Sequence, residues 1–206
     1  MKQRELLPLA WLASGVAILI GGATLVCANG TCRALTIDLA GLALLNAWRT
    51  SGLDTFFAAI TWFGSLSILL PVALLVAWRA SRRSSFRASA FVPFSLLVAA
   101  SMAHVVKLIV ERSRPEQFPA LVLMPADWSY PSAHAMQATA FVLALLIHIQ
   151  PSAGQVIGAM IFVLLVGISR IYLQVHFPTD VAFGILAAIC CTLAARELTV
   201  ARRSIA

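Results

Sequence analysis

Residues Leu6–Cys27 read LLPLAWLASGVAILIGGATLVC, an apolar run without a charged side chain that is long enough to cross a bilayer. Within lipid a backbone must satisfy its own hydrogen bonds, so such a run predicts a transmembrane helix. Five further runs of similar character follow along the chain. They are Phe56–Trp78, Ala88–Val110, His134–His148, Val156–Leu173 and Val181–Ala195. The sequence therefore predicts an all-α integral membrane bundle of six transmembrane helices.

The composition of the whole chain also indicates a membrane protein. Of its 206 residues, 61% are hydrophobic and only 11% are charged, whereas a soluble domain carries about 25% charged residues. This excludes an ordinary soluble domain, a disordered chain and a disulfide-stapled secreted domain. The net charge is +7, but the basic residues lie mostly between apolar runs, so we expect no nucleic-acid partner. Residues 1–206 are predicted to form a single membrane-embedded domain.

The stretch of residues 34–48, between the first two runs, is ambiguous. It contains Asp38, while Leu35, Leu39 and Leu42 fall on one helical face. We interpret it as a short amphipathic helix that lies in the membrane interface.

The first run and the turn that follows it each leave an alternative open. Lys2 and Arg4 precede the run, as they would in a secretory signal, but the run is long for a signal and no clean cleavage site follows, so we expect a retained helix. Cys27 and Cys32 flank a polar turn and could form a disulfide or remain free thiols.

The basic residues predict the orientation in the membrane. With a cytoplasmic N-terminus, nine of them fall inside and six outside, as the positive-inside rule prefers. An even number of spans then places both termini in the cytoplasm, and we expect a plasma or inner membrane protein. The inner set is Lys2, Arg4, Arg79, Arg82, Arg83, Arg87, Arg196, Arg202 and Arg203, and the outer set is Arg33, Arg49, Lys107, Arg112, Arg114 and Arg170.

Most of the chemically informative polar residues lie in three segments that this layout brings to the outer, extracytoplasmic face. The segments are Lys107–Pro115, Tyr130–His134 and Ser169–Asp180. The first two lie in the connection between the third and fourth spans, and the third lies between the fifth and sixth spans, so the six-span layout brings all three to the same membrane face. His104, one turn before Lys107, either lines the same region or is simply interfacial.

Lys107 and Arg114 form a pair of cations beside the bilayer. They are seven residues apart, so two helical turns would place them on one face, although Pro115 disfavours helix at Arg114. Cations near hydrocarbon are costly unless they meet an anion. The simpler alternative is interfacial snorkelling, with Glu111 as the partner of Lys107.

The second segment predicts an anion-binding helix start. Pro131 suits the first position of a helix, where Ser132, Ala133 and His134 would offer free backbone N–H groups. A plain helix start with an interfacial histidine is the simpler alternative.

The third segment pairs a histidine with a carboxylate. Asp180 follows His176 by four residues, close enough to accept a hydrogen bond from one ring nitrogen and leave the other as nucleophile or base. Alternatively, Asp180 only caps the helix that Pro178 begins. Arg170 adds a third cation.

Three cations, two histidines and one carboxylate match phosphoryl transfer through a histidine, which needs charge neutralisation, a nucleophile and a proton donor. The set lacks the acidic cluster that a magnesium phosphatase needs, and no zinc-type spacing is present. We therefore expect no metal and no cofactor.

At these positions the sequence resembles the type 2 phosphatidic acid phosphatase superfamily, whose signature is K-x6-R-P, P-S-G-H and S-R-x5-H-x3-D. The order and internal spacing match over residues 107–180, and the span layout extends the likeness over nearly the whole chain. Ala133 replaces the glycine of the second motif, which matters if that position needs a positive φ. The matching residues are Lys107, Arg114, Pro115, Pro131, Ser132, His134, Ser169, Arg170, His176 and Asp180.

The resemblance implies a role for each of these positions. His176 would be the nucleophile that forms a phospho-histidine, Asp180 its orienting partner, and His134 the general acid that later activates water. The phosphate would be held by Lys107, Arg114, Arg170, Ser132 and the Ala133 N–H. The family uses no metal.

The resemblance also implies the activity of a membrane lipid phosphatase that hydrolyses a phosphomonoester or diphosphate headgroup at the outer face. Its partners would be the bilayer and a lipid substrate such as a polyprenyl diphosphate, phosphatidic acid, phosphatidylglycerol phosphate or a lipid A phosphate. The motifs contact only phosphate, so the lipid stays open, as does the oligomeric state. The alternatives are a lipid phosphotransferase that uses the same histidine and a non-enzymatic anion or lipid carrier.

Overall fold

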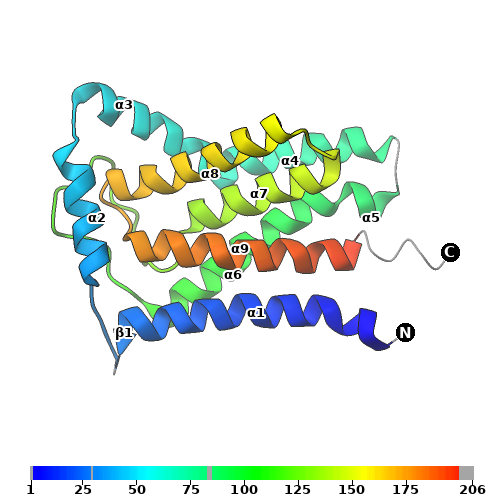
Figure 1. Cartoon of the computed structure of the whole chain (residues 1–206), viewed down its shortest axis with the longest axis horizontal. Helices are drawn as coiled ribbons and strands as arrows, with labels where there is room; N and C mark the ends of the chain where they lie inside the picture. Colours follow the sequence, from blue (N-terminus) through cyan, green and yellow to red (C-terminus); the bar gives the residue numbers. More distant parts are fainter. Residues whose placement is uncertain (1, 29, 83–84, 200–206) are drawn as a thin grey trace.

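The computed structural model describes residues 2–28, 30–82 and 85–199, which form a helical bundle with one short β-hairpin (Figure 1). Arg83, Arg202 and Arg203, which entered the charge count, lie outside the described residues. The elements are α1 (Lys2–Val26), β1 (Cys27–Ala28), β2 (Thr31–Cys32), α2 (Thr36–Ala47), α3 (Ser51–Ile60), the 3-10 helix η1 (Thr61–Gly64), α4 (Leu66–Ser81), α5 (Phe86–Ser89), α6 (Phe91–Val110), α7 (Ala133–Ile149), α8 (Ala153–Tyr172) and α9 (Pro178–Thr199).

Among the described residues, four helices are long and apolar enough to cross a membrane, namely α1, α6, α8 and α9. A fifth candidate is the pair formed by α3–η1 and α4, which is bent by 48° at the break between them. Helices α7 and α2 are also apolar, but with 17 and 12 residues they are shorter than these four helices. The prediction of a helical membrane bundle is confirmed, whereas the predicted number of six spans is not.

The second predicted run, Phe56–Trp78, is not one continuous helix. The chain turns at Ser65, which is extended at φ −81° and ψ 146°. The preceding Gly64 packs so tightly that an added Cβ would lie 2.5 Å from Val166 Cγ1 and 3.3 Å from His134 Cβ. The break therefore lets η1 press against α7 and α8 near the predicted site.

Helix α2 lies across one end of the bundle (Figure 1). The residues that it buries are only partly those that the amphipathic pattern predicted. Leu42 is buried, but Leu39 is 42% exposed and Asp38 is fully buried. Asp38 faces the protein because it meets the guanidinium of Arg112 at 2.7 Å. At Gly41 a side chain would lie 2.6 Å from a ring carbon of Pro178, so α2 also packs closely against the start of α9.

Helix α1 runs along α9 as an integral part of the bundle (Figure 1). An added Cβ at Gly15 would lie 3.2 Å from Cys190 Cβ, the close approach that small residues permit in membrane helix packing. The hydroxyl of Tyr130 donates to the carbonyl of Leu19 at 2.9 Å. These contacts join α1 to α9 and to the loop before α7.

The hairpin that follows α1 settles the alternative left open for the first two cysteines. Strands β1 and β2 are antiparallel, and Cys27 lies opposite Cys32. The two residues are joined by a disulfide, whereas Cys190 and Cys191 are free and buried in α9.

The tight packing at Gly64 leads to a stability prediction. A methyl group there must displace Val166, and overpacking of this kind costs about 1–3 kcal/mol. We expect Gly64→Ala to lower the thermal unfolding midpoint of the detergent-solubilised protein. Gly158 in α8 is the matched control, because nothing lies within 4 Å of a Cβ added there. Equal midpoints for Gly64→Ala and Gly158→Ala would contradict this account of the break.

Candidate active site

The three polar segments converge at the end of the bundle opposite the start of α1 and the end of α9 (Figure 1). This end holds the C-termini of α6 and α8 and the N-termini of α7 and α9, as the predicted layout requires. The backbone N–H of Ser132 donates to the Asp180 carbonyl at 3.1 Å. Arg114 Nη1 donates to the Val175 carbonyl at 2.6 Å. Hydrogen bonds thus join all three segments.

His176 lies between a cation and a carboxylate, and its side chain is 2% exposed. Its Nε2 is 3.2 Å from Arg114 Nη1. A guanidinium can only donate, so this Nε2 must carry a lone pair and the ring proton must sit on Nδ1. Nδ1 faces Asp180 Oδ2 and Ser129 Oγ, each at 3.4 Å. The geometry therefore selects the tautomer with a free Nε2.

Asp180 is fully buried and held by shorter contacts than the one to His176. Its Oδ2 accepts from Ser129 Oγ at 2.5 Å and from the Phe177 N–H at 3.0 Å. Its Oδ1 accepts from Arg112 Nη1 at 2.6 Å. The predicted pairing of His176 with Asp180 is therefore present at 3.4 Å, but the carboxylate is positioned mainly by other groups.

The surroundings of His176 keep its ring neutral. Burial lowers the pKa of this imidazole well below its ordinary value, because the protonated ring would lose its hydration. Nearby positive charges lower the pKa further, in decreasing order those of Arg114, Lys107 and Arg170. Arg114 is the one of these in direct contact with the ring.

Lys107 and Arg114 do not stack on one helical face, so that prediction was wrong. Helix α6 ends at Val110, and Glu111 takes a left-handed conformation with φ 50°. The two cations instead meet at Asp127, whose carboxylate lies 3.0 Å from Lys107 Nζ and 2.5 Å from Arg114 Nη2.

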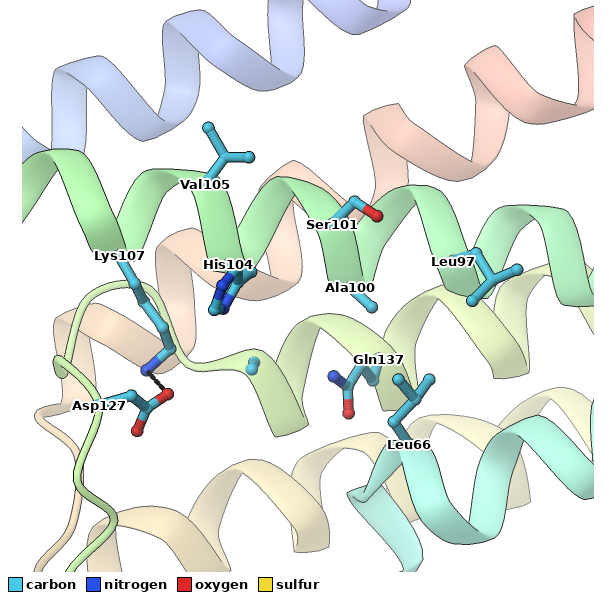
Figure 2. A pocket seen from close by; sticks show the side chains of 10 residues that line it. Leu66, Leu97, Ala100, Ser101, His104, Val105, Lys107, Asp127 and Gln137 are labelled. Carbon is cyan, nitrogen blue, oxygen red and sulfur yellow. Dashed lines mark ion pairs between the residues drawn. The ribbon is translucent and has the colours of Figure 1, made fainter.

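Asp127, and not Glu111, is thus the partner of Lys107 (Figure 2). Lys107 also donates to the Trp128 carbonyl. Burial by itself would raise the pKa of Asp127, but Lys107 and Arg114 outweigh it and hold the pKa below its usual value. Asp127 therefore stays ionised and acts as a counter-ion beside the two cations.

Arg170 and Ser132 are buried polar groups with incomplete hydrogen bonding. Arg170 Nη1 donates to Thr61 Oγ1 at 2.6 Å, a neutral partner. Among the described residues, four buried side-chain atoms have no hydrogen-bond partner: Arg112 Nε, Ser132 Oγ, Arg170 Nε and Gln174 Oε1. Buried polar atoms are usually paired. Ser132 and Arg170 are motif residues, so their two atoms suit a ligand that brings oxygen acceptors.

Helix α7 begins two residues later than predicted. Its first residue is Ala133, Ser132 takes the N-cap position with extended backbone, and Pro131 precedes both. Ala133 is helical, so the missing glycine of the second motif costs nothing in backbone conformation. The free N–H groups of the first turn lie at the positive end of the helix dipole.

A pocket of about 560 Å³ adjoins this cluster between α4, α6 and α7 (Figure 2). Lys107 and Asp127 line one side of it, and His104 and Gln137 project into it. The remaining wall is mostly apolar. The pocket therefore joins the charged cluster to a hydrophobic surface.

Three residues that support the predicted site residues were not predicted from the sequence. Arg112 and Ser129 hold Asp180, and Asp127 holds Lys107 and Arg114. One signal was available, because Asp38 inside an otherwise apolar stretch implies a buried cationic partner.

A sequence profile described as the PAP2 superfamily matches residues 88–204. The chain belongs to the PAP2 superfamily. The family resemblance that the three motifs predicted is therefore confirmed.

Two curated PAP2 relatives are lipid phosphatases by name. The chain is 30% identical over 146 residues to the undecaprenyl-diphosphatase of Sulfolobus acidocaldarius, with 68% of each chain covered. It is also 30% identical over 159 residues to phosphatidylglycerophosphatase B of Bacillus subtilis, with 72% of this chain and 74% of that one covered.

A solved PAP2 structure shares the fold. The crystal structure of a transmembrane PAP2-type phosphatidylglycerolphosphate phosphatase from Bacillus subtilis superimposes with a TM-score of 0.78 at 22% identity. The match covers 98% of this chain and 100% of that one.

The lowered pKa of His176 predicts its protonation state. At pH 6, below the ordinary histidine pKa of about 6.5, its ring should remain neutral and protonated at Nδ1. NMR of ¹⁵N-histidine-labelled protein measures this, with the signal assigned by His176→Gln. Arg114→Gln removes a positive charge, so it should move the titration to higher pH. A wild-type ring already protonated at pH 6 would contradict this account of the site.

Proposed function

We propose that this chain is an integral membrane lipid phosphatase that hydrolyses a phosphomonoester or diphosphate headgroup through a phospho-histidine. The observation that carries the proposal is the unprotonated Nε2 of His176, 3.2 Å from Arg114 Nη1 in a buried cationic site. A neutral imidazole beside a guanidinium suits attack on a phosphorus atom whose oxygens bind that guanidinium.

In the first step, the Nε2 lone pair of His176 attacks phosphorus and the bond from phosphorus to the leaving oxygen breaks. The Nδ1–H proton faces Asp180, which stabilises the charge that the ring acquires. His134 donates a proton to the departing lipid alkoxide or phosphate. The products of this step are the protonated leaving group and a phospho-histidine.

In the second step, the neutral His134 takes a proton from water, and the resulting hydroxide attacks phosphorus. The phosphorus–nitrogen bond breaks, its electron pair returns to Nε2 of His176, and inorganic phosphate leaves. His134 is protonated again, so both histidines regain their starting states.

The phosphate oxygens would be bound by Lys107, Arg114 and Arg170, with Ser132 Oγ and the Ala133 N–H completing the set. The unpartnered Arg170 Nε and Ser132 Oγ support this assignment, because phosphate oxygens accept from both. Removal of one such donor typically costs about 2.7–4 kcal/mol of transition-state stabilisation. These side chains supply the charge neutralisation, and we propose a metal-independent reaction without a cofactor.

We further propose that the bundle crosses the membrane six times, with α3–α4 as one bent span, α7 as a short span and α2 in the interface. The protein would lie in the plasma or inner membrane, with both termini in the cytoplasm. The site would then lie at the extracytoplasmic face. The start of α1 and the end of α9 lie at the opposite end from the site, in keeping with this layout.

The substrate would keep its hydrocarbon in the bilayer while the phosphate enters the cationic cluster. The named activities of the two curated relatives make a polyprenyl diphosphate and a phosphatidylglycerol phosphate the first substrates to test.

We predict that the purified protein releases inorganic phosphate from at least one of these lipids in the presence of a chelator. His176→Ala should abolish release, because no nucleophile remains. His148→Ala is the matched control, since His148 lies in the last turn of α7, far from the site. A phosphate-release assay in detergent checks this prediction.

Undiminished turnover in His176→Ala, or a strict need for Mg²⁺, would overturn the proposal. Loss of substrate phosphate without free phosphate, only when a lipid acceptor is added, would instead identify a phosphotransferase.

A further inference from the structure

Arg112 forms a buried hub that the three motifs do not include. Its guanidinium is 1% exposed and lies 2.6 Å from Asp180 and 2.7 Å from Asp38. Nη1 also donates to Thr179 Oγ1 and Nη2 to the Arg33 carbonyl, each at 2.9 Å. The guanidinium therefore joins α2, the end of α6 and the start of α9.

The two carboxylate oxygens of Asp180 have different partners. Arg112 takes Oδ1, which leaves Oδ2 to face His176. The guanidinium also lies over the Phe177 ring, 4.0 Å from its centroid, so it is fixed on a further side. Nη1 contacts Asp180 and Nη2 contacts Asp38, so the planar guanidinium holds the two carboxylates in a fixed relation to each other.

Asp38 fixes the opposite side of the hub and ties it to α2. Its Oδ2 accepts from Arg112, and both of its oxygens accept from Thr179, one from the N–H and one from the hydroxyl, at 3.0 Å each. Thr179 directly precedes Asp180 in the first turn of α9. Helix α2 is therefore hydrogen-bonded to the same turn of α9 that carries the Asp180 carboxylate.

The hydrogen bonds of Arg112 come from its two terminal nitrogens, while its Nε is buried without a hydrogen-bond partner among the described residues. Its two terminal nitrogens are engaged by Asp180, Thr179, Asp38 and Arg33, and none of its contacts is with Lys107, Arg114 or Arg170. Among these partners, Asp180 is the one that faces His176, so it connects Arg112 to the proposed nucleophile.

We propose that Arg112 is a positioning residue for the reaction, which together with Asp38 on α2 fixes the Asp180 carboxylate and through it the tautomer and orientation of His176. The kinetic test of this inference rests on the proposed function. The spectroscopic test, which observes the tautomer of His176, does not.

The kinetic test compares kcat with phosphate affinity. Arg112→Met should lower kcat by about 100-fold, the upper range for loss of a supporting partner. KM and the inhibition constant for inorganic phosphate should stay within about threefold of wild type, because the side chains proposed to bind phosphate are not changed. Arg112→Lys, which keeps the charge but lacks the fork, should restore only part of the rate.

The spectroscopic test reads His176 directly. In ¹⁵N-histidine NMR, wild-type His176 should be the Nδ1–H tautomer, and the Arg112 variants should show a mixture with Nε2–H. Arg49→Met is the matched control, because Arg49 pairs with Asp54 at 3.5 Å in a partly exposed contact outside the hub. This control should change neither kcat nor the tautomer.

Three results would overturn the proposal: unchanged kcat in Arg112→Met, a parallel loss of kcat and phosphate affinity, or an unchanged His176 tautomer. If Arg112→Met does not fold, Arg112→Lys decides by the same two readouts. Failure of the proposed function would appear in the wild-type protein as absent phosphate release. In that case the tautomer comparison still tests the role of Arg112.

Discussion

Charge buried at the end of an apolar helical bundle costs free energy unless each group meets a counter-ion or a dense set of hydrogen bonds. The polar end of this protein is organised by that constraint. Lys107 and Arg114 share the carboxylate of Asp127, and Arg112 lies between Asp38 and Asp180. The charged residues thus bring α2, α6 and α9 together with the loop before α7.

Arg170 departs from this pattern, and the departure points to function. Its guanidinium meets only the Thr61 hydroxyl as a side-chain partner, while its Nε and the nearby Ser132 hydroxyl stay unpaired among the described residues. A phosphate group supplies the negative charge and the acceptor oxygens that this corner needs. Burial lowers the pKa of His176, and the same positive charges lower it further, so the groups that would bind the phosphate also help to keep the nucleophile neutral.

The sequence allowed most of the helices to be located and the three motif segments to be placed at one end of the bundle, because apolar runs and motif spacing are local properties. Helix α6 was found within a few residues, and His176 and Asp180 were correctly expected to be neighbours. The helical stacking of Lys107 and Arg114 was wrong, because a left-handed residue at Glu111 ends the helix between them. Nothing local in the sequence announces that conformation.

The supporting contacts could not be predicted because they join residues far apart in the chain. Asp38 and Arg112 lie 74 residues apart, and Asp127 meets its two cations across a loop. The break at Ser65 was missed for a related reason, since it depends on the fit of Gly64 against α7 and α8. Hydrophobic pattern sets where helices form, whereas tertiary packing sets where they bend.

The central claim is that the phosphoryl group passes through His176. The most direct measurement mixes the protein rapidly with lipid substrate that carries ³²P in its terminal phosphate, stops the reaction in alkali and locates the label by peptide mapping. The account predicts label on the peptide that contains His176, formed within the first turnover and lost at the rate of phosphate release. Phosphate release without label at this position, or with label on another residue, would contradict it.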